Sequence, residues 1–115
     1  MNIKNLPKLE RPREKALHFG IEKLSDYELL ALLIGSGSSS DSALDIAYKM
    51  LTDNQGLFHL VQKPMRDLIN YKGIGESKAV KIIAAFELAK RYNSLQPQYE
   101  KQSIDNEFIY KRYKE

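Results

Sequence analysis

Two glycines separated by one apolar residue, Gly73-Ile74-Gly75, lie between two segments with helical patterning. Glycine adopts positive φ angles at little cost, so this pair permits a tight turn and leaves backbone amides with no side chain over them. Ile74 can anchor the turn in the core, and Gly75 leads directly into a helix N-terminus, where free N–H groups and the helix dipole favour an anion. The sequence therefore predicts a helical hairpin that carries a candidate phosphate site.

Basic residues flank this turn on both sides. Lys78 follows Gly75 by about one helical turn and would neutralise a bound phosphate, while the small Ala79 lets two helices approach closely. Contacts of this kind read the nucleic-acid backbone and not its sequence. Many helical hairpins only join helices or bind protein, so that alternative stays open. The predicted phosphate-binding residues are Lys72, Gly73, Ile74, Gly75, Lys78 and Lys81.

Other glycine motifs that bind phosphate do not fit this turn. A dinucleotide-binding fingerprint requires a third glycine, where this chain has Lys78, and it follows a strand and not a helix. A P-loop requires a Gly-Lys-Ser/Thr triplet, which the sequence lacks. The two glycines therefore favour a helical hairpin over a dinucleotide-binding fingerprint or a P-loop.

The remaining pattern predicts helices and no strand. Pro12 and Gly20 suit the first position and the end of a helix over 12–19. Ser25 to Glu28 forms a capping box for a helix to about Ile34. Further helices are expected from a cap at Ser40 or Asp41 to about Thr52, in a turn over 57–62, over 64–70, and over 76–95 with Pro97 as its stop. Their expected inner faces are Ala43, Ile46, Ala47, Met50 and Leu51, then Met65, Leu68 and Ile69, then Ala79, Ile82, Ile83, Phe86 and Ala89.

An earlier segment echoes the hairpin. Ile34-Gly35-Ser36-Gly37 also lies between two predicted helices, and residues 43–47 then align with residues 79–83. Two such units predict an all-α fold of five to six short helices in a compact, double helix-hairpin-helix-like domain, although two short apolar helices can also resemble each other by chance. Asp45 stands where the second copy has Lys81, and the first loop has no basic residue. The second hairpin is therefore the better candidate for DNA, and the first is structural or offers weak contacts from its serines.

Charge is unevenly distributed along the 115 residues. The net charge is +3, but residues 24–55 carry −4 and residues 61–92 carry +4. Such polarity suits a domain with one face toward a polyanion, and it also fits an ordinary solvated surface. The longest apolar run has six residues, against about 20 needed to span a bilayer. With no cysteine, no membrane segment and no signal sequence, the chain is expected to be a soluble cytoplasmic protein.

No residue set supports catalysis or a metal site. The two histidines, His18 and His59, are far apart in sequence and are expected on helix surfaces. Zinc requires three or four well-placed ligands. Asp41 and Asp45 share a predicted helix face, where the helix dipole explains them. The seven tyrosines suggest a stacking platform for single strands, but helix packing explains Tyr27 and Tyr48 as well. We expect no catalytic residue, no metal and no cofactor in this chain.

The hairpin resembles the helix-hairpin-helix motif of DNA repair and recombination proteins over about 25 residues. A longer resemblance, over about residues 10–92, is to the N-terminal region of the RadC family. It rests on Arg11-Pro12-Arg13-Glu14-Lys15, Leu24-Ser25-Asp26-Tyr27-Glu28-Leu29-Leu30-Ala31, Gly37, Ser42-Ala43-Leu44-Asp45-Ile46-Ala47, the hairpin, and Ala85-Phe86-Glu87-Leu88-Ala89-Lys90-Arg91. The motif's mode implies that the amides of Gly73 and Gly75 contact DNA phosphates.

The RadC resemblance also implies a C-terminal JAB/MPN metallopeptidase-like domain, with a Glu, a His-x-His pair and an Asp around zinc. This chain has no His-x-His pair. It is expected to comprise a flexible arm (1–9), a helix-hairpin-helix domain (10–95) and a connector (96–115) toward that absent domain. The first hypothesis is a DNA-backbone-binding module, with branched or single-stranded DNA among its candidate targets. The alternative is a docking or regulatory domain for the family's own C-terminal domain.

Overall fold

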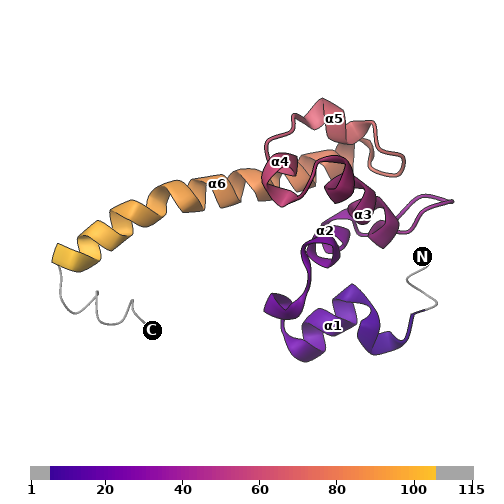
Figure 1. Ribbon diagram of the computed structural model, residues 1–115, viewed down its shortest axis with the longest axis horizontal. Helices are drawn as coiled ribbons and strands as arrows, with labels where there is room; N and C mark the ends of the chain where they lie inside the picture. Colours follow the sequence, from indigo (N-terminus) through magenta and orange to yellow (C-terminus); the bar gives the residue numbers. More distant parts are fainter. Residues whose placement is uncertain (1–5, 106–115) are drawn as a thin grey trace. The chain divides into compact units, whose positions relative to one another are not determined.

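A computed structural model describes residues 6–105, and the side chains of residues 6–97. These residues form helices and no strand, which confirms the predicted all-α class. Two short 3₁₀ segments, Lys8–Glu10 and Ile21–Lys23, flank α1. The α-helices are α1 (Pro12–Phe19), α2 (Asp26–Ile34), α3 (Ala43–Asp53), α4 (Leu57–Leu60), α5 (Met65–Ile69) and α6 (Gly75–Asp105) (Figure 1).

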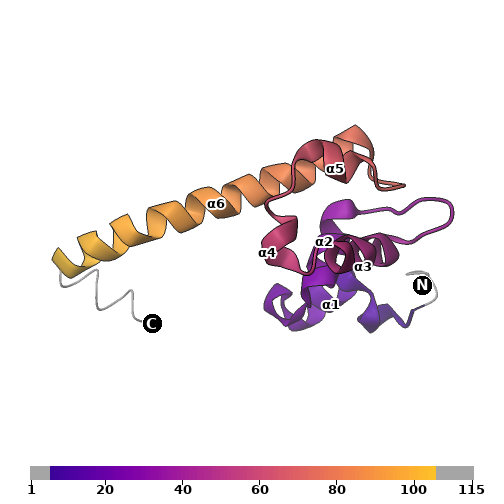
Figure 2. The ribbon, with the colours of Figure 1, turned by 45° about the horizontal axis from the view of Figure 1, so that its top comes forward.

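Residues up to Ile83 form one unit, and a second unit begins at Ala84 within α6. In the first unit, α2 and α3 lie side by side in both views (Figures 1 and 2), and the other helices contribute fewer buried residues. Leu60 of α4 and Leu68 of α5 are fully buried, as is Ile82 of α6. The buried residues of α2 and α3 are Glu28, Leu30, Ala31, Ile34, Ala43, Leu44, Ile46, Ala47 and Met50.

Capping boxes begin both α2 and α3. The Ser25 hydroxyl accepts the amide of Glu28, as predicted, and the Glu28 carboxylate accepts the amide of Ser25 at 2.9 Å. In α3 the equivalent pair is Ser42 and Asp45, with both bonds at 3.1 Å. The prediction that Ser40 or Asp41 caps this helix was wrong, because only Ser42 has an acidic residue three positions later to close the box.

Buried Glu28 ties α1 to α2. Its carboxylate accepts hydrogen bonds from Ser25 and from the Lys15 ammonium at 3.1 Å. Burial by itself would raise the pKa of Glu28, but the bonds from Ser25 and Lys15 outweigh it and lower the pKa below 4.5. The carboxylate is therefore charged and fully partnered at neutral pH.

α6 departs from the prediction at its C-terminal side. Pro97 lies inside the helix and does not stop it. A proline inside a helix removes one N–H donor and crowds the carbonyl four residues earlier, but its fixed φ angle is itself helical, and α6 continues through it. Ala89, predicted on the buried stripe, is exposed, whereas Ile82 and Phe86 are buried as predicted. The helix is thus longer than the predicted helix over 76–95, and it continues into the segment expected as a connector.

Candidate functional site

The second hairpin joins α5 to α6 through Asn70–Ile74. Gly73 has a φ of 93° and Gly75 a φ of 61°, both in the region that favours glycine. Ile74 is 2% exposed, and its amide donates to the carbonyl oxygen of Tyr71 at 3.1 Å. The turn therefore has the two features that the sequence predicted, positive φ at both glycines and an apolar residue held in the core.

Gly73 lies against the first hairpin. A Cβ at this position would be 2.9 Å from Cδ1 of Ile46 in α3 and 3.2 Å from Cβ of Ser38 in the loop between α2 and α3. A Cβ at Gly75 would meet nothing within 4 Å. The two loops lie on the same side of the unit (Figures 1 and 2). Gly73 thus serves close packing between the two hairpins, while Gly75 faces open space.

Lys78 connects the two loops. Its ammonium donates to the carbonyl oxygen of Gly73 at 3.0 Å and to the hydroxyl of Ser36 at 3.2 Å, and also to the carbonyl oxygen of Ser36. The sequence predicted that Lys78 would neutralise a phosphate, but its donors are used within the chain. Sequence reasoning missed this role because Ser36 is 42 positions away. The only available signal was the alignment of the two loops in the internal repeat.

Lys72 and Lys81 are exposed, and within the described part of the chain neither ammonium has a hydrogen-bond or ion-pair partner. The first turn of α6 is also open: among residues 6–97, no side chain accepts a hydrogen bond from its first amides. In α3, by contrast, Ser42 accepts the amide of Asp45. The N-terminus of α6 at Gly75 is thus without a side-chain cap among the described residues, with Lys72 three residues before it and Lys81 six residues after it in the chain.

The loop of the first hairpin hydrogen-bonds to itself. The Ser38 hydroxyl accepts the amides of Asp41 at 3.0 Å and Ser40 at 3.3 Å, and the Ser38 amide donates to the Asp41 carbonyl oxygen at 2.8 Å. A Cβ at Gly37 would come within 2.0 Å of that carbonyl oxygen. The loop is closed and has no basic residue, so few of its polar groups remain for a phosphate.

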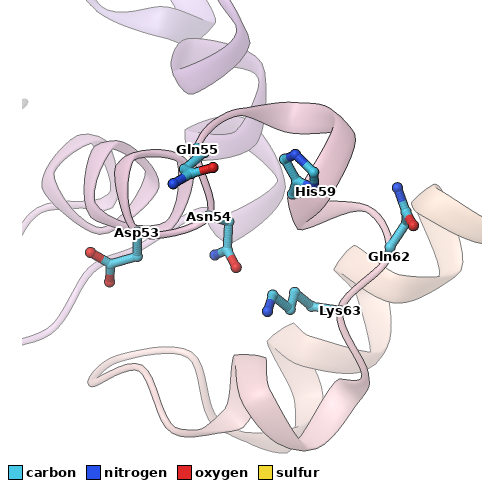
Figure 3. A pocket seen from close by; sticks show the side chains of 6 residues that line it. All are labelled: Asp53, Asn54, Gln55, His59, Gln62 and Lys63. Carbon is cyan, nitrogen blue, oxygen red and sulfur yellow. The ribbon is translucent and has the colours of Figure 1, made fainter.

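A polar hollow of about 370 Å³ lies between the end of α3 and the segment after α4 (Figure 3). Sequence reasoning did not single it out. Near it, the Tyr71 hydroxyl donates to the Asp53 carboxylate at 2.9 Å, and burial together with that carboxylate raises the pKa of Tyr71 to about 12. The lining residues are Asp53, Asn54, Gln55, His59, Gln62 and Lys63.

The described residues contain no cluster of His, Cys, Asp or Glu that could hold a metal ion. His18 and His59 are both exposed, as the sequence predicted. No helix in the described range is long and apolar enough to span a membrane.

A protein-family model described as "UPF0758 N-terminal" matches residues 3–80. A UPF0758 protein of Carboxydothermus hydrogenoformans is 44% identical over 114 residues, which cover 97% of this chain and 50% of the relative. A UPF0758 protein of Alkaliphilus oremlandii is 47% identical over 92 residues, which cover 79% of this chain and 40% of the relative. A UPF0758 protein of Geotalea uraniireducens is 51% identical over 94 residues, which cover 80% of this chain and 41% of the relative. The chain thus spans half or less of the length of these relatives. No solved structure gives a significant match.

Proposed function

This chain belongs to the UPF0758 family, and on that premise we propose that it is a DNA-binding module that contacts the phosphate backbone without reading sequence. The observation that carries the proposal is the open N-terminus of α6, where Gly75 has no neighbour over it and no side chain caps the first amides among the described residues. Backbone amides at such an end, with the helix dipole, favour a phosphate group.

Lys72 and Lys81 supply the positive charge at this end. Both are exposed and unpaired in the described structure, so they can approach a phosphate without breaking an internal bond. In this proposal Lys78 does not contact DNA. It holds the turn against the first hairpin, so that Gly73, Ile74 and Gly75 keep their positions when DNA arrives. The proposed contacts are therefore the Gly75 end of α6, Lys72 and Lys81.

The resemblance to the RadC N-terminal region supports the same proposal, because its hairpin motif is one of DNA repair and recombination proteins. The names of the UPF0758 relatives do not mention DNA. We further propose that this chain performs no catalysis and holds no cofactor. A JAB/MPN-like zinc site, if the family has one, then belongs to the part of the longer relatives that this chain does not match.

The second candidate function is docking of a protein partner, with the family's own C-terminal domain as the first candidate. The observation that favours it is on the second unit, where Leu88, Tyr92 and Leu95 are 68%, 62% and 47% exposed. Their spacing places them along one face of α6. An apolar face of this kind suits a protein partner better than DNA.

Fluorescence anisotropy of labelled duplex, single-stranded and branched DNA over a salt series separates the two functions. We expect binding that weakens steeply with salt. In duplex DNA each lost phosphate contact should reduce the salt slope by about 0.9. Lys72→Gln and Lys81→Gln should each show this reduction, whereas Lys23→Gln, an exposed lysine outside the hairpin, should not. Absence of binding at low salt by the folded chain would overturn the DNA function and leave docking.

A further inference from the structure

A second hollow lies away from the α5–α6 hairpin, where the start of α2 meets the end of α3. It has a volume of about 420 Å³. Tyr27 and Tyr48 contribute aromatic rings, Leu51 adds an apolar side chain, and Asp26 adds a carboxylate. The remaining lining residues, Ser25, Thr52, Gln55 and Gly56, are polar or small. The hollow therefore combines an apolar surface with a single acidic group.

Core packing does not explain the position of Tyr48. Its side chain is 61% exposed, although Ala47 and Met50 on the same helix are fully buried. The ring meets that of Tyr27 edge to face, with centroids 6.3 Å apart and an interplanar angle of 89°. In the described part of the chain neither phenol hydroxyl has a hydrogen-bond partner. Two aromatic rings and two free hydroxyls are thus presented to a ligand.

The charge of this region selects the ligand. Asp26 is the only charged residue that lines the hollow. Among the residues described, its carboxylate has no hydrogen-bond or ion-pair partner. A phosphate would be repelled here, whereas a cation gains from the carboxylate and from the faces of the aromatic rings.

We propose that this hollow binds an arginine side chain presented by a peptide segment of a protein partner. The planar guanidinium stacks on the exposed ring of Tyr48 and pairs with the carboxylate of Asp26, while its aliphatic stem lies along Leu51. A planar guanidinium suits stacking on a ring better than a compact, strongly hydrated lysine ammonium does. The site is independent of the proposed DNA function, because it shares no residue with the α5–α6 hairpin.

The test uses the full 115-residue chain, labelled with ¹⁵N, and three capped pentapeptides of the form Gly-Gly-Xaa-Gly-Gly with Xaa as arginine, lysine or citrulline. Citrulline keeps the shape of arginine and removes its charge. We expect the arginine peptide to shift the amide signals of Tyr27, Tyr48 and Leu51. Affinity should fall with lysine and should be lost with citrulline.

Two variants with matched controls locate the site. Tyr48→Ala and Asp26→Asn should each weaken arginine binding about fivefold, as loss of a ring contact or of a carboxylate partner predicts. Tyr92→Ala removes an equally exposed tyrosine of α6, and Asp67→Asn removes an exposed acid of α5. Both controls should leave affinity unchanged. Equal binding of the three peptides, equal effects of variants and controls, or signal shifts confined to other residues would each overturn the proposal.

Discussion

The two hairpins of the first unit share a pattern and differ in how their polar groups are used. The loop between α2 and α3 is closed by bonds from Ser38 to the Asp41 backbone, and the helix that follows is capped by Ser42. The turn between α5 and α6 leaves Gly75 open and contains exposed Lys72, and exposed Lys81 follows in α6. The groups of the first hairpin are bonded within its own loop and by Lys78, whereas the second hairpin leaves the amides at the start of α6 without a side-chain cap among the described residues.

This difference shows why similarity of hydrophobic pattern does not imply similarity of function. The apolar residues of both copies serve one core, in which Ile46 and Ile74 are each 2% exposed. The ligand chemistry depends on a few polar positions outside that core. Asp45 caps α3, while its counterpart in the repeat, Lys81, is an exposed cation. The first hairpin thus supports the geometry of the second.

Among the substitutions that test how the two hairpins differ, replacement of Gly73 should change the free energy of unfolding most. Gly73→Ala introduces a Cβ at 2.9 Å from Ile46 Cδ1 and a side chain at a φ of 93°. Left-handed strain and overpacking together should lower the free energy of unfolding by about 2–4 kcal/mol. The control is Gly75→Ala, which has open space and should cost about 1 kcal/mol. Denaturant unfolding measures both, and equal costs would contradict close packing of the hairpins at Gly73.

Replacement of Lys78 should have the next largest effect. Lys78→Met keeps much of the apolar stem but removes the bonds to Gly73 and Ser36, so the free energy of unfolding should fall by about 1–2 kcal/mol. Hydrogen exchange should accelerate in the loop around Ser36. Lys81→Met, on the same helix but without these bonds, should change stability by less than about 0.5 kcal/mol. If Lys78→Met were neutral and abolished DNA binding, Lys78 would be a phosphate contact after all.

Removal of the α3 cap tests whether the start of α3 is stabilised by a side-chain cap and the start of α6 is not. Ser42→Ala loses the bond from its hydroxyl to the Asp45 amide, which should lower the free energy of unfolding by about 1 kcal/mol. Ser77→Ala replaces an exposed serine in the first turn of α6 and should change it by less than about 0.5 kcal/mol. Thermal unfolding of both variants gives the comparison. A comparable loss from Ser77→Ala would mean that α6 has a serine cap and is not open to a ligand.

Local sequence rules predicted what short-range chemistry determines. The Ser25–Glu28 capping box, the bounds of α1 and the buried Ile74 follow from residues only a few positions apart. Features that depend on contacts across the fold were not predicted. The bonds from Lys78 to Ser36 and from Tyr71 to Asp53 join residues 42 and 18 positions apart. The proposed DNA contacts at Lys72, Gly75 and Lys81 stay predictions.

The smallest expected effect concerns the bond that joins the second hairpin to the end of α3. Tyr71→Phe removes the hydroxyl that donates to Asp53 at 2.9 Å, and at neutral pH this should lower the free energy of unfolding by about 0.5–1 kcal/mol. Burial and the Asp53 carboxylate raise the pKa of Tyr71 from its usual value of 10.0 to about 12. The folded state therefore favours the neutral phenol. The contribution of the neutral Tyr71 phenol to the free energy of unfolding is fully present below pH 10 and is lost as the pH rises toward 12.

Absorbance of the tyrosinate form measures this titration, and comparison of the chain with its variants assigns each step to a residue. In the folded chain Tyr71 should ionise late, with a midpoint near pH 12, and Tyr71→Phe should remove that late step. Asp53→Asn should move the step to lower pH, because it removes the negative charge beside the phenol. The matched control, Tyr92→Phe, alters an exposed tyrosine of α6 and should leave the late step in place. If the late step persisted in Tyr71→Phe, the hydroxyl would not be held by Asp53, and the second hairpin would depend on Gly73, Ile74 and Lys78 for its position.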